Sequence, residues 1–484
     1  MKGSWDFVWS NGQTKSASIS YLNQLSRERE ETQMRQKLTM GGKLFPSKVG
    51  LKLVVLGSVS ALTVASLSVP ITANAASVST TLTKKKITLV IADETGFPLT
   101  DKLAEEFTKQ YPNVKFKINR DSFANLTANA PRLMASKNAP DLIRLPTIGD
   151  TVKNKLLLKL NPYFKAYGWN KWSEAQLSGL RVNSKNVRGS GSLYQLGLGY
   201  SITGVFMNLN HAKTLGITEP PKSLAEFEAA LAKAKAAGIL PIMAGDKDGV
   251  VNFAVQALIN IYGDRKQLSD WIYNVPGARY DTPGAIKGAD KIREWADKGY
   301  FPEDINAIDY FTFITRFQNG EGLFEFNGNW EAANVQAKLG SNAKFFLFPP
   351  LNKGGKHVAM GAANSFSVPA KSKNKDAIVY FLNWIHTNKK ARQITLDVTG
   401  ATPGGDPKLA LPKVAPGSLI EDGLKMAAQL SNDNGYIDFM ANATAGIYAN
   451  AIIPQSQLLV SSKITGKEFV TAVQESYAKE LGNK

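Results

Sequence analysis

The run KITLVIADETGFPLTDKLAEEFTKQYPNVKFKIN (residues 86–119) contains the signals of a strand, a helix and a second strand in succession. Lys86–Ala92 is a short run rich in β-forming residues, and Val114–Asn119 alternates apolar residues with polar ones. Between them, Pro98–Tyr111 carries apolar residues at helical spacing, and its proline suits the first turn of a helix. The stretch therefore predicts two strands joined by a crossover helix.

The same alternation continues along the chain. Phe123–Ser136 is predicted to be a helix and Asp141–Leu145 a strand, which completes a βαβαβ unit with parallel strands. The β-rich run Leu193–Leu209 opens a second unit, and Ser223 with Glu226 forms a capping-box signature for the next helix. Further strands are predicted over Gly238–Met243, Leu323–Phe326, Phe345–Phe348 and Ser365–Pro369. Further helices are predicted over Thr282–Lys298, Phe311–Phe317, Glu331–Leu339, Asp376–Thr387 and Gly466–Leu481.

Composition excludes several classes of protein. The 484 residues are 43% hydrophobic, which is ordinary for a globular chain, and cysteine is absent. Disulfide frameworks, thiolate metal sites and cysteine nucleophiles are therefore excluded. The three histidines, His211, His357 and His386, are never at i, i+4 spacing, so we do not expect a histidine-based metal site. The net charge of +18 is spread along the chain, so we do not expect a nucleic-acid partner.

The front of the chain predicts export. An apolar run, Leu53–Ile71, follows several lysines and precedes Ala73-Asn74-Ala75, and this order is typical of a secretory signal peptide. We interpret residues 40–75 as that signal, with cleavage after Ala75. The polar stretch 1–39 is out of place before a signal, so we interpret it as a non-native or misannotated extension, with Met40 or Met34 as the true start. The mature chain would carry no further membrane span.

Several segments carry a resemblance to one family. They are TGVFMN (203–208), PPKSLAEF (220–227), GEGLFEFNGNW (320–330), SVPAKSKNKDA (367–377) and KITGKEF (463–469). In this order and spacing the chain resembles the extracellular solute-binding proteins of bacterial ABC sugar importers, relatives of maltose-binding protein. The resemblance covers almost all of residues 84–484.

The resemblance implies a two-lobed α/β fold of the periplasmic-binding-protein type (type II), each lobe a mainly parallel sheet flanked by helices. We expect residues 84–196 with 351–399 in lobe 1, and 201–347 with 403–484 in lobe 2. Chain crossings between the lobes are expected near Gly197–Ser201, Phe348–Leu351 and Thr399–Pro403, where glycine and proline suit hinges.

The resemblance also implies the function. It implies a monomer without catalytic activity that binds a mono- or oligosaccharide between the lobes and delivers it to a membrane permease. The energy source would belong to the transporter, so we expect no cofactor. Many Gram-positive relatives carry a lipobox cysteine, which this chain lacks. We therefore expect a periplasmic protein, or one associated with the cell surface by other means.

A sugar presents apolar C–H faces and a rim of hydroxyls, so its site needs an aromatic platform with polar groups around it. Trp330 follows a predicted strand and a glycine turn, and the resemblance implies that it stacks on the sugar. Glu94 with Thr95, Asp121, and Arg144 with Thr147 follow or close the first three strands, at the edge where parallel sheets bind ligands. The remaining candidates are Tyr200, Asp246, Gly361, Asn364, Ser365, Tyr436 and Asp438. A surface turn for Asp121, and a core role for Tyr436 and Asp438, are equally open.

Two other functions compete with the sugar receptor. The chain could bind another solute, such as a polyamine, a peptide or an anionic compound, and a basic cleft would favour an anion. The loop at 246–252 lacks an aromatic residue that many relatives have, which leaves the identity of the ligand open. An exported glycoside hydrolase would need two carboxyl groups about 5–9.5 Å apart across one bond, and no pair in the sequence suggests itself. The phenylalanines at 311–317, 324–326 and 345–348 fall at helix or strand spacing, and we interpret them as core residues.

Overall fold

A single sheet connects the lobes of this protein. The computed structural model describes residues 78–172, 174–406 and 408–482, so the predicted signal peptide and the extension before it lie outside the described residues. The strand order is β2-β1-β3-β9-β6-β7, with β10 paired to β9 and β8 paired to β6. These strands are β1 Ile87–Glu94, β2 Val114–Asp121, β3 Leu142–Arg144, β6 Gln195–Asn208, β7 Phe324–Gly328, β8 Ala343–Phe346, β9 Ala359–Ser367 and β10 Tyr436–Ile437; a separate hairpin joins β4 Arg181–Val182 to β5 Ser192–Leu193.

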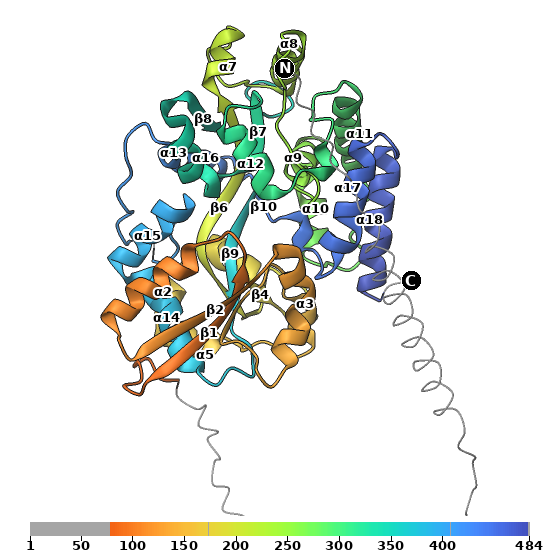
Figure 1. The fold of residues 1–484 in the computed structure, drawn as a ribbon. Helices are drawn as coiled ribbons and strands as arrows, with labels where there is room; N and C mark the ends of the chain where they lie inside the picture. The colour runs from red at the N-terminus through yellow and green to blue at the C-terminus, as the bar shows by residue number, and fades with distance from the viewer. Residues whose placement is uncertain (1–77, 173, 407, 483–484) are drawn as a thin grey trace, which may run out of the picture. The chain divides into compact units, whose positions relative to one another are not determined.

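The predicted βαβαβ unit forms the first lobe. β1 pairs in parallel with β2 and with β3, and β9 then adds to β3 in the antiparallel direction. Helices α2 and α3 join these strands (Figure 1), because a parallel neighbour can be reached only by a crossover. The helices of this part of the chain are α2 Leu99–Gln110, α3 Phe123–Ala135, α4 Gly149–Lys153, α5 Asn161–Ala166 and α6 Glu174–Leu177, joined later by α14 Lys375–Thr387 and α15 Lys389–Thr399.

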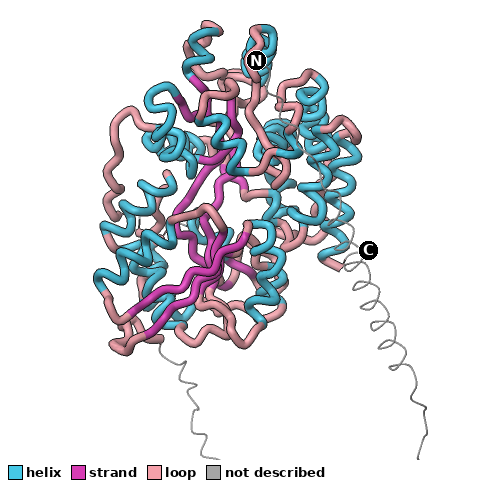
Figure 2. The backbone as a smooth tube through the Cα atoms, viewed as in Figure 1, coloured by secondary structure: helices cyan, strands magenta, loops and turns pink. Residues whose placement is uncertain are grey.

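The second lobe collects most of the remaining helices around the other end of β6 (Figure 2). Ser223 caps the N-terminus of α8, and its hydroxyl accepts the amide hydrogen of Glu226 at 3.2 Å, as the capping signature predicts. The carboxylate of Glu226 turns to the amide of Lys222 instead of completing the reciprocal bond. These helices are α7 Leu209–Thr214, α8 Leu224–Ala236, α9 Asn252–Tyr262, α10 Arg265–Ile272, α11 Pro283–Asp297, α12 Tyr310–Gln318, α13 Ala332–Leu339, α16 Leu419–Asn432, α17 Ile453–Val460 and α18 Gly466–Glu480.

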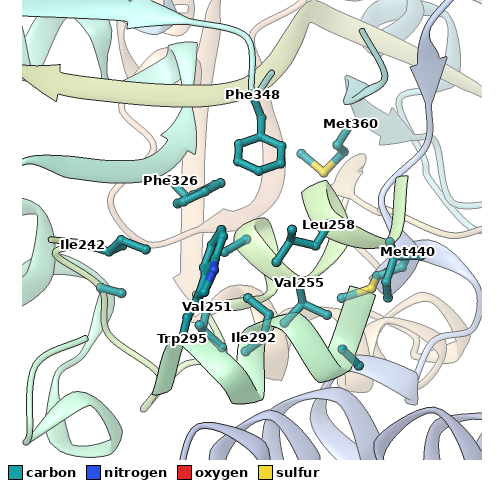
Figure 3. Close-up of a cluster of buried hydrophobic side chains, with 14 of the residues drawn as sticks. Ile242, Val251, Val255, Leu258, Ile292, Trp295, Phe326, Phe348, Met360 and Met440 are labelled. Atoms are coloured by element: carbon teal, nitrogen blue, oxygen red, sulfur yellow. The ribbon is translucent and has the colours of Figure 1, made fainter. Parts of the chain in front are cut away.

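Each lobe has its own apolar core. In the first lobe, Leu89 of β1 and Phe107 of α2 pack with Phe381 of α14. In the second lobe, one core lies between β6 and helices α9 and α11, and Figure 3 shows Trp295 with Phe326 in it. A further core on the other side of β6 includes Phe345, from β8. Removing this much apolar surface from water is the main term that favours the folded state.

Two predictions about the second lobe differ from the structure. Gly238–Met243 does not form a strand; Ile242 makes only an isolated bridge to Phe324. The sheet of this lobe is also not mainly parallel, because β6 pairs antiparallel with both β7 and β8. Residues 209–323 separate β6 from β7, and α13 separates β7 from β8, so each connection is long enough for either strand direction.

No helix among the described residues is long and apolar enough to cross a membrane.

His386 of α14 is fully buried beside the segment that leads out of the first lobe. Its ring contacts the ring of Trp172 with centroids 4.6 Å apart, and it lies against Gly404. Burial lowers the pKa of His386 from 6.5 to about 3, and the nearby Arg392 guanidinium adds to this effect. The folded protein therefore holds a neutral histidine at pH values where the unfolded chain binds a proton.

This burial predicts a loss of stability in acid. Between pH 6.5 and about 3 only the unfolded chain protonates His386, so the free energy of unfolding falls by about 1.4 kcal/mol per pH unit from this group. A His386→Phe variant keeps a ring against Trp172 but cannot take up the proton. Urea unfolding at pH 7 and pH 4.5 measures how much the free energy of unfolding falls on acidification, and this fall should be larger for the wild type than for the variant. Equal losses would contradict this assignment.

Candidate functional site

β6 and β9 form a two-stranded ribbon whose faces carry different side chains. Ser201 pairs with Ala362 and Ile202 with Gly361. Successive residues of a strand point to opposite faces, and paired residues point to the same face. We call the face that carries Ala362, Asn364 and Phe366 the front face, and the face that carries Gly361, Ala363 and Ser365 the rear face.

Two glycines show on which face each neighbouring aromatic ring lies. Gly328 of β7 pairs with Thr203, a front-face residue of β6, and a Cβ on Gly328 would lie 1.9 Å from the Trp330 ring. A Cβ on Gly361 would lie 2.2 Å from the Tyr436 ring. Trp330 therefore covers the front face and Tyr436 covers the rear face, and each ring occupies space that only glycine leaves open.

On the front face the first lobe contributes an ion pair. The Glu94 carboxylate at the end of β1 lies 3.3 Å from Arg144 at the end of β3. The Arg144 guanidinium lies over two rings, 5.1 Å from the centre of Phe97 and 5.7 Å from that of Phe366. Its Nη1 atom is buried and has no hydrogen-bond partner. Burial raises the pKa of Glu94, and the charge of Arg144 opposes this rise.

The second lobe contributes Trp330, which is held by a hydrogen-bond relay. The indole Nε1 donates to the Tyr310 hydroxyl at 2.7 Å, and this hydroxyl donates to the Glu331 carboxylate at 2.9 Å. Glu331 also accepts a hydrogen bond from Asn334. Burial raises the pKa of Glu331, and the two donors oppose this rise. The relay fixes the rotation of the indole ring while leaving it partly exposed.

Two aromatic contacts join the lobes near these groups. The Phe311 ring packs on Gly96, so that a Cβ there would lie 2.4 Å from the ring, and Phe311 is also next to the Tyr310 ring. Elsewhere, Phe123 of α3 contacts Tyr448 with ring centres 6.1 Å apart. A series of ring contacts leads from Tyr448 back to Trp330 through Phe439 and Phe253. The front site therefore combines half-buried rings with one acid and one guanidinium.

The structure divides the thirteen predicted site residues into groups. Those on the front side are Glu94, Arg144, Trp330 and Asn364, whose Nδ2 is buried without a partner. A second group lines a cavity of about 560 Å³ against the rear face: Tyr200, Gly361, Ser365, Tyr436 and Asp438.

The other four predicted residues belong to neither group. Thr95 is exposed, and Asp121 is exposed at the end of β2, where it accepts the amide of Ser122 at 2.8 Å. Thr147 and Asp246 are buried. Asp246 has no exposed surface, and burial raises its pKa well above the ordinary value. A carboxylate placed after a buried segment can turn inward as readily as outward, and sequence position does not decide between the two.

Sequence reasoning missed several aromatic residues of the front site. Phe311 was assigned to the core but is 53% exposed, while the other phenylalanines of those three runs are buried. The signal was present in the spacing, because Phe313 and Phe317 lie on the buried face of α12 and Phe311 lies off it. Tyr310, Phe253 and Tyr448 carry no comparable signal, because their positions depend on contacts between distant segments.

Among residues 78–482, apart from the undescribed 173 and 407, no group of three acidic or histidine side chains could hold a metal ion.

Comparisons with known proteins agree with this architecture. Solved structures with the same fold include a chitin oligosaccharide binding protein (TM-score 0.69, 18% identity, covering 82% of this chain and 100% of that one). Another is the solute receptor AcbH, described as preferring β-D-galactopyranose (TM-score 0.66, 20% identity, covering 81% of this chain and 98% of that one). A third is a maltose-bound MalE3 of T. maritima (TM-score 0.63, 14% identity, covering 81% of this chain and 99% of that one). No curated protein matches the sequence. The model of the bacterial extracellular solute-binding proteins matches residues 92–392, and the chain belongs to this family.

Proposed function

We propose that the chain is the extracytoplasmic substrate-binding component of an ABC carbohydrate importer, which binds a mono- or oligosaccharide and delivers it to a membrane permease. The observation that carries the proposal is the front site, where the Trp330 ring and the Glu94–Arg144 pair lie on the same side of the ribbon. The contact of Phe311 with Gly96 connects the two groups across the lobes.

This combination matches the surface of a sugar. A half-buried indole can stack on the apolar C–H face of a pyranose ring, and charged groups hydrogen-bond to its hydroxyls. The front side also holds two buried donors without partners, Arg144 Nη1 and Asn364 Nδ2. Buried donors are rarely left unpaired, so hydroxyl oxygens of a bound sugar are suitable partners for them. The acid and the guanidinium neutralise each other, which favours a neutral ligand over a polyamine or an anion.

The ribbon supplies a hinge for capture. Leu198 of β6 lies in the first-lobe core and Ile202 in a second-lobe core, so the first crossing falls within Gly197–Ser201. In β9, Met360 packs in the second lobe and Phe366 in the first, so we place the second crossing between them instead of at Phe348–Leu351. The third is placed at Thr399–Pro403, where Thr402 pairs with Tyr200. Rotation about these segments would open and close the front site.

Replacing Trp330 tests the platform. Trp330→Ala should weaken binding of whichever neutral saccharide binds the wild type by about tenfold or more, which corresponds to about 1.4 kcal/mol, because the stacking surface is lost. Trp330→Phe keeps a smaller ring, so its saccharide affinity should lie between those of the wild type and Trp330→Ala. Titration calorimetry against a panel of mono- and oligosaccharides measures this. Unchanged sugar affinity in Trp330→Ala would refute the platform, and binding of an amine or anion but no sugar would refute the ligand class.

Tyr310 is predicted to position Trp330. Tyr310→Phe removes only the hydroxyl that joins Trp330 to Glu331, so the indole loses its acceptor and the buried carboxylate loses a donor. We expect a several-fold weaker saccharide affinity and a loss of about 1–3 kcal/mol in the free energy of unfolding. Glu331→Gln retains an acceptor for the Tyr310 hydroxyl and should keep most of the affinity. Equal affinities for wild type and Tyr310→Phe would show that the relay has no part in binding.

A further inference from the structure

A cavity lies against the rear face of the ribbon, and its lining also includes Ser201 and Ala362 of the front face. Its volume of about 560 Å³ lies within the range of about 300–1,000 Å³ that is usual for small-molecule sites. Tyr436 stands over Gly361 on the rear face, whereas Trp330 covers the opposite face. Neither Trp330 nor Glu94 nor Arg144 lines the cavity. A ligand of the front site would therefore leave it empty.

The charges of the lining are balanced. Arg188 and Asp438 are the only charged residues that line the cavity in the described chain, and their side chains pair at 2.8 Å. Arg188 is 4% exposed and also donates to the backbone oxygens of Gly179 and Asn442. Its Nε atom and the Asn442 Oδ1 atom have no hydrogen-bond partner. The lining therefore carries no net charge, and two of its residues hold a donor and an acceptor that the protein leaves unpaired, which favours a neutral, hydrogen-bonding ligand.

The lining combines serine, threonine and amide side chains with large apolar side chains that are partly open to solvent. Tyr436 is 41% exposed and Leu411 is 64% exposed, so both offer apolar surface to a ligand. The Tyr436 hydroxyl donates to the backbone oxygen of Ala427 at 2.8 Å, so the ring is held in place. Tyr200 and Tyr273 add two further rings to the lining. An apolar group of a ligand would cover these surfaces.

We propose that this rear cavity is a second binding site, for a neutral glycoside that carries an apolar aglycone. The sugar hydroxyls would meet the Arg188 and Asn442 edge, and the aglycone would cover Tyr436 and Leu411. The proposal does not depend on what binds at Trp330.

A ligand in the cavity would also affect the arrangement of the two lobes about the hinge. Gln176 belongs to the first lobe and Leu424 to the second, and both line the cavity. A ligand that contacts both lobes binds best to one arrangement of them, so it must change the affinity of the front site, and the front ligand must change its affinity by the same factor.

The probe for this test is phenyl β-D-glucopyranoside, with glucose as the matched compound that lacks the aglycone. By titration calorimetry, the wild type and Trp330→Ala should bind the phenyl glucoside with equal affinity. Trp330→Ala should bind glucose at least tenfold more weakly than it binds the phenyl glucoside. Two variants alter the cavity: Ser431→Trp fills it from α16, and Leu411→Asp puts a charge at its exposed edge. Each should weaken the binding of the phenyl glucoside at least tenfold. Thermal unfolding of each variant verifies that it is folded.

Three results would overturn the proposal. Absence of phenyl glucoside binding to the wild type would refute the ligand class. Loss of binding in Trp330→Ala would place the probe at the front site, whether or not the cavity variants also lose it. Unchanged binding in both Ser431→Trp and Leu411→Asp would show that the probe does not occupy the cavity. None of these results bears on saccharide binding at Trp330, which the titrations of the preceding section decide separately.

Discussion

The pairing of β6 with β9 is the constraint on which the rest of the structure depends. Both strands begin in one apolar core and end in another, so the same backbone hydrogen bonds stabilise the ribbon and connect the lobes. The register is interrupted between Gly197 and Tyr200, within the segment where β6 leaves the first lobe. An irregularity of this kind bends a strand and increases its twist locally. The two lobes can therefore change their angle without losing the sheet that joins them.

The ribbon also separates two sets of side chains that are close in sequence. Neighbouring residues of β9 face opposite ways, so Asn364 belongs to the front and Ser365 to the rear. An aromatic ring covers a glycine on each face, Trp330 over Gly328 and Tyr436 over Gly361. Nine of the thirteen residues predicted as one site therefore divide between the two faces, four on the front and five on the rear. A contiguous stretch of sequence at a hinge cannot be assigned to one ligand until the strand register is known.

Much of the fold could be predicted from local patterns, because β1, α2, β2 and α3 bury alternating or helically spaced residues within short segments. Gly238–Met243 has the same apolar character but makes only one bridge, since its backbone bonds go to Tyr300 and Phe324 outside a ladder. Of the candidate site, Trp330 was predicted from its place after a strand and a glycine together with the family resemblance, and Glu94 and Arg144 from the ends of parallel strands. The supports of Trp330 could not be predicted, because Tyr310 and Phe253 reach it only through tertiary packing.

The most direct test of the central claim, that a saccharide is bound between lobes that close about the ribbon, is a distance measurement across them. The chain has no cysteine, so two substitutions, Lys102→Cys in α2 and Lys247→Cys in the second lobe, give unique spin-label positions on exposed residues. Pulsed electron resonance would give the distance distribution with and without a saturating saccharide. The account predicts a shift to a shorter, narrower distribution on binding. Saturation with an unchanged or longer distance would contradict it.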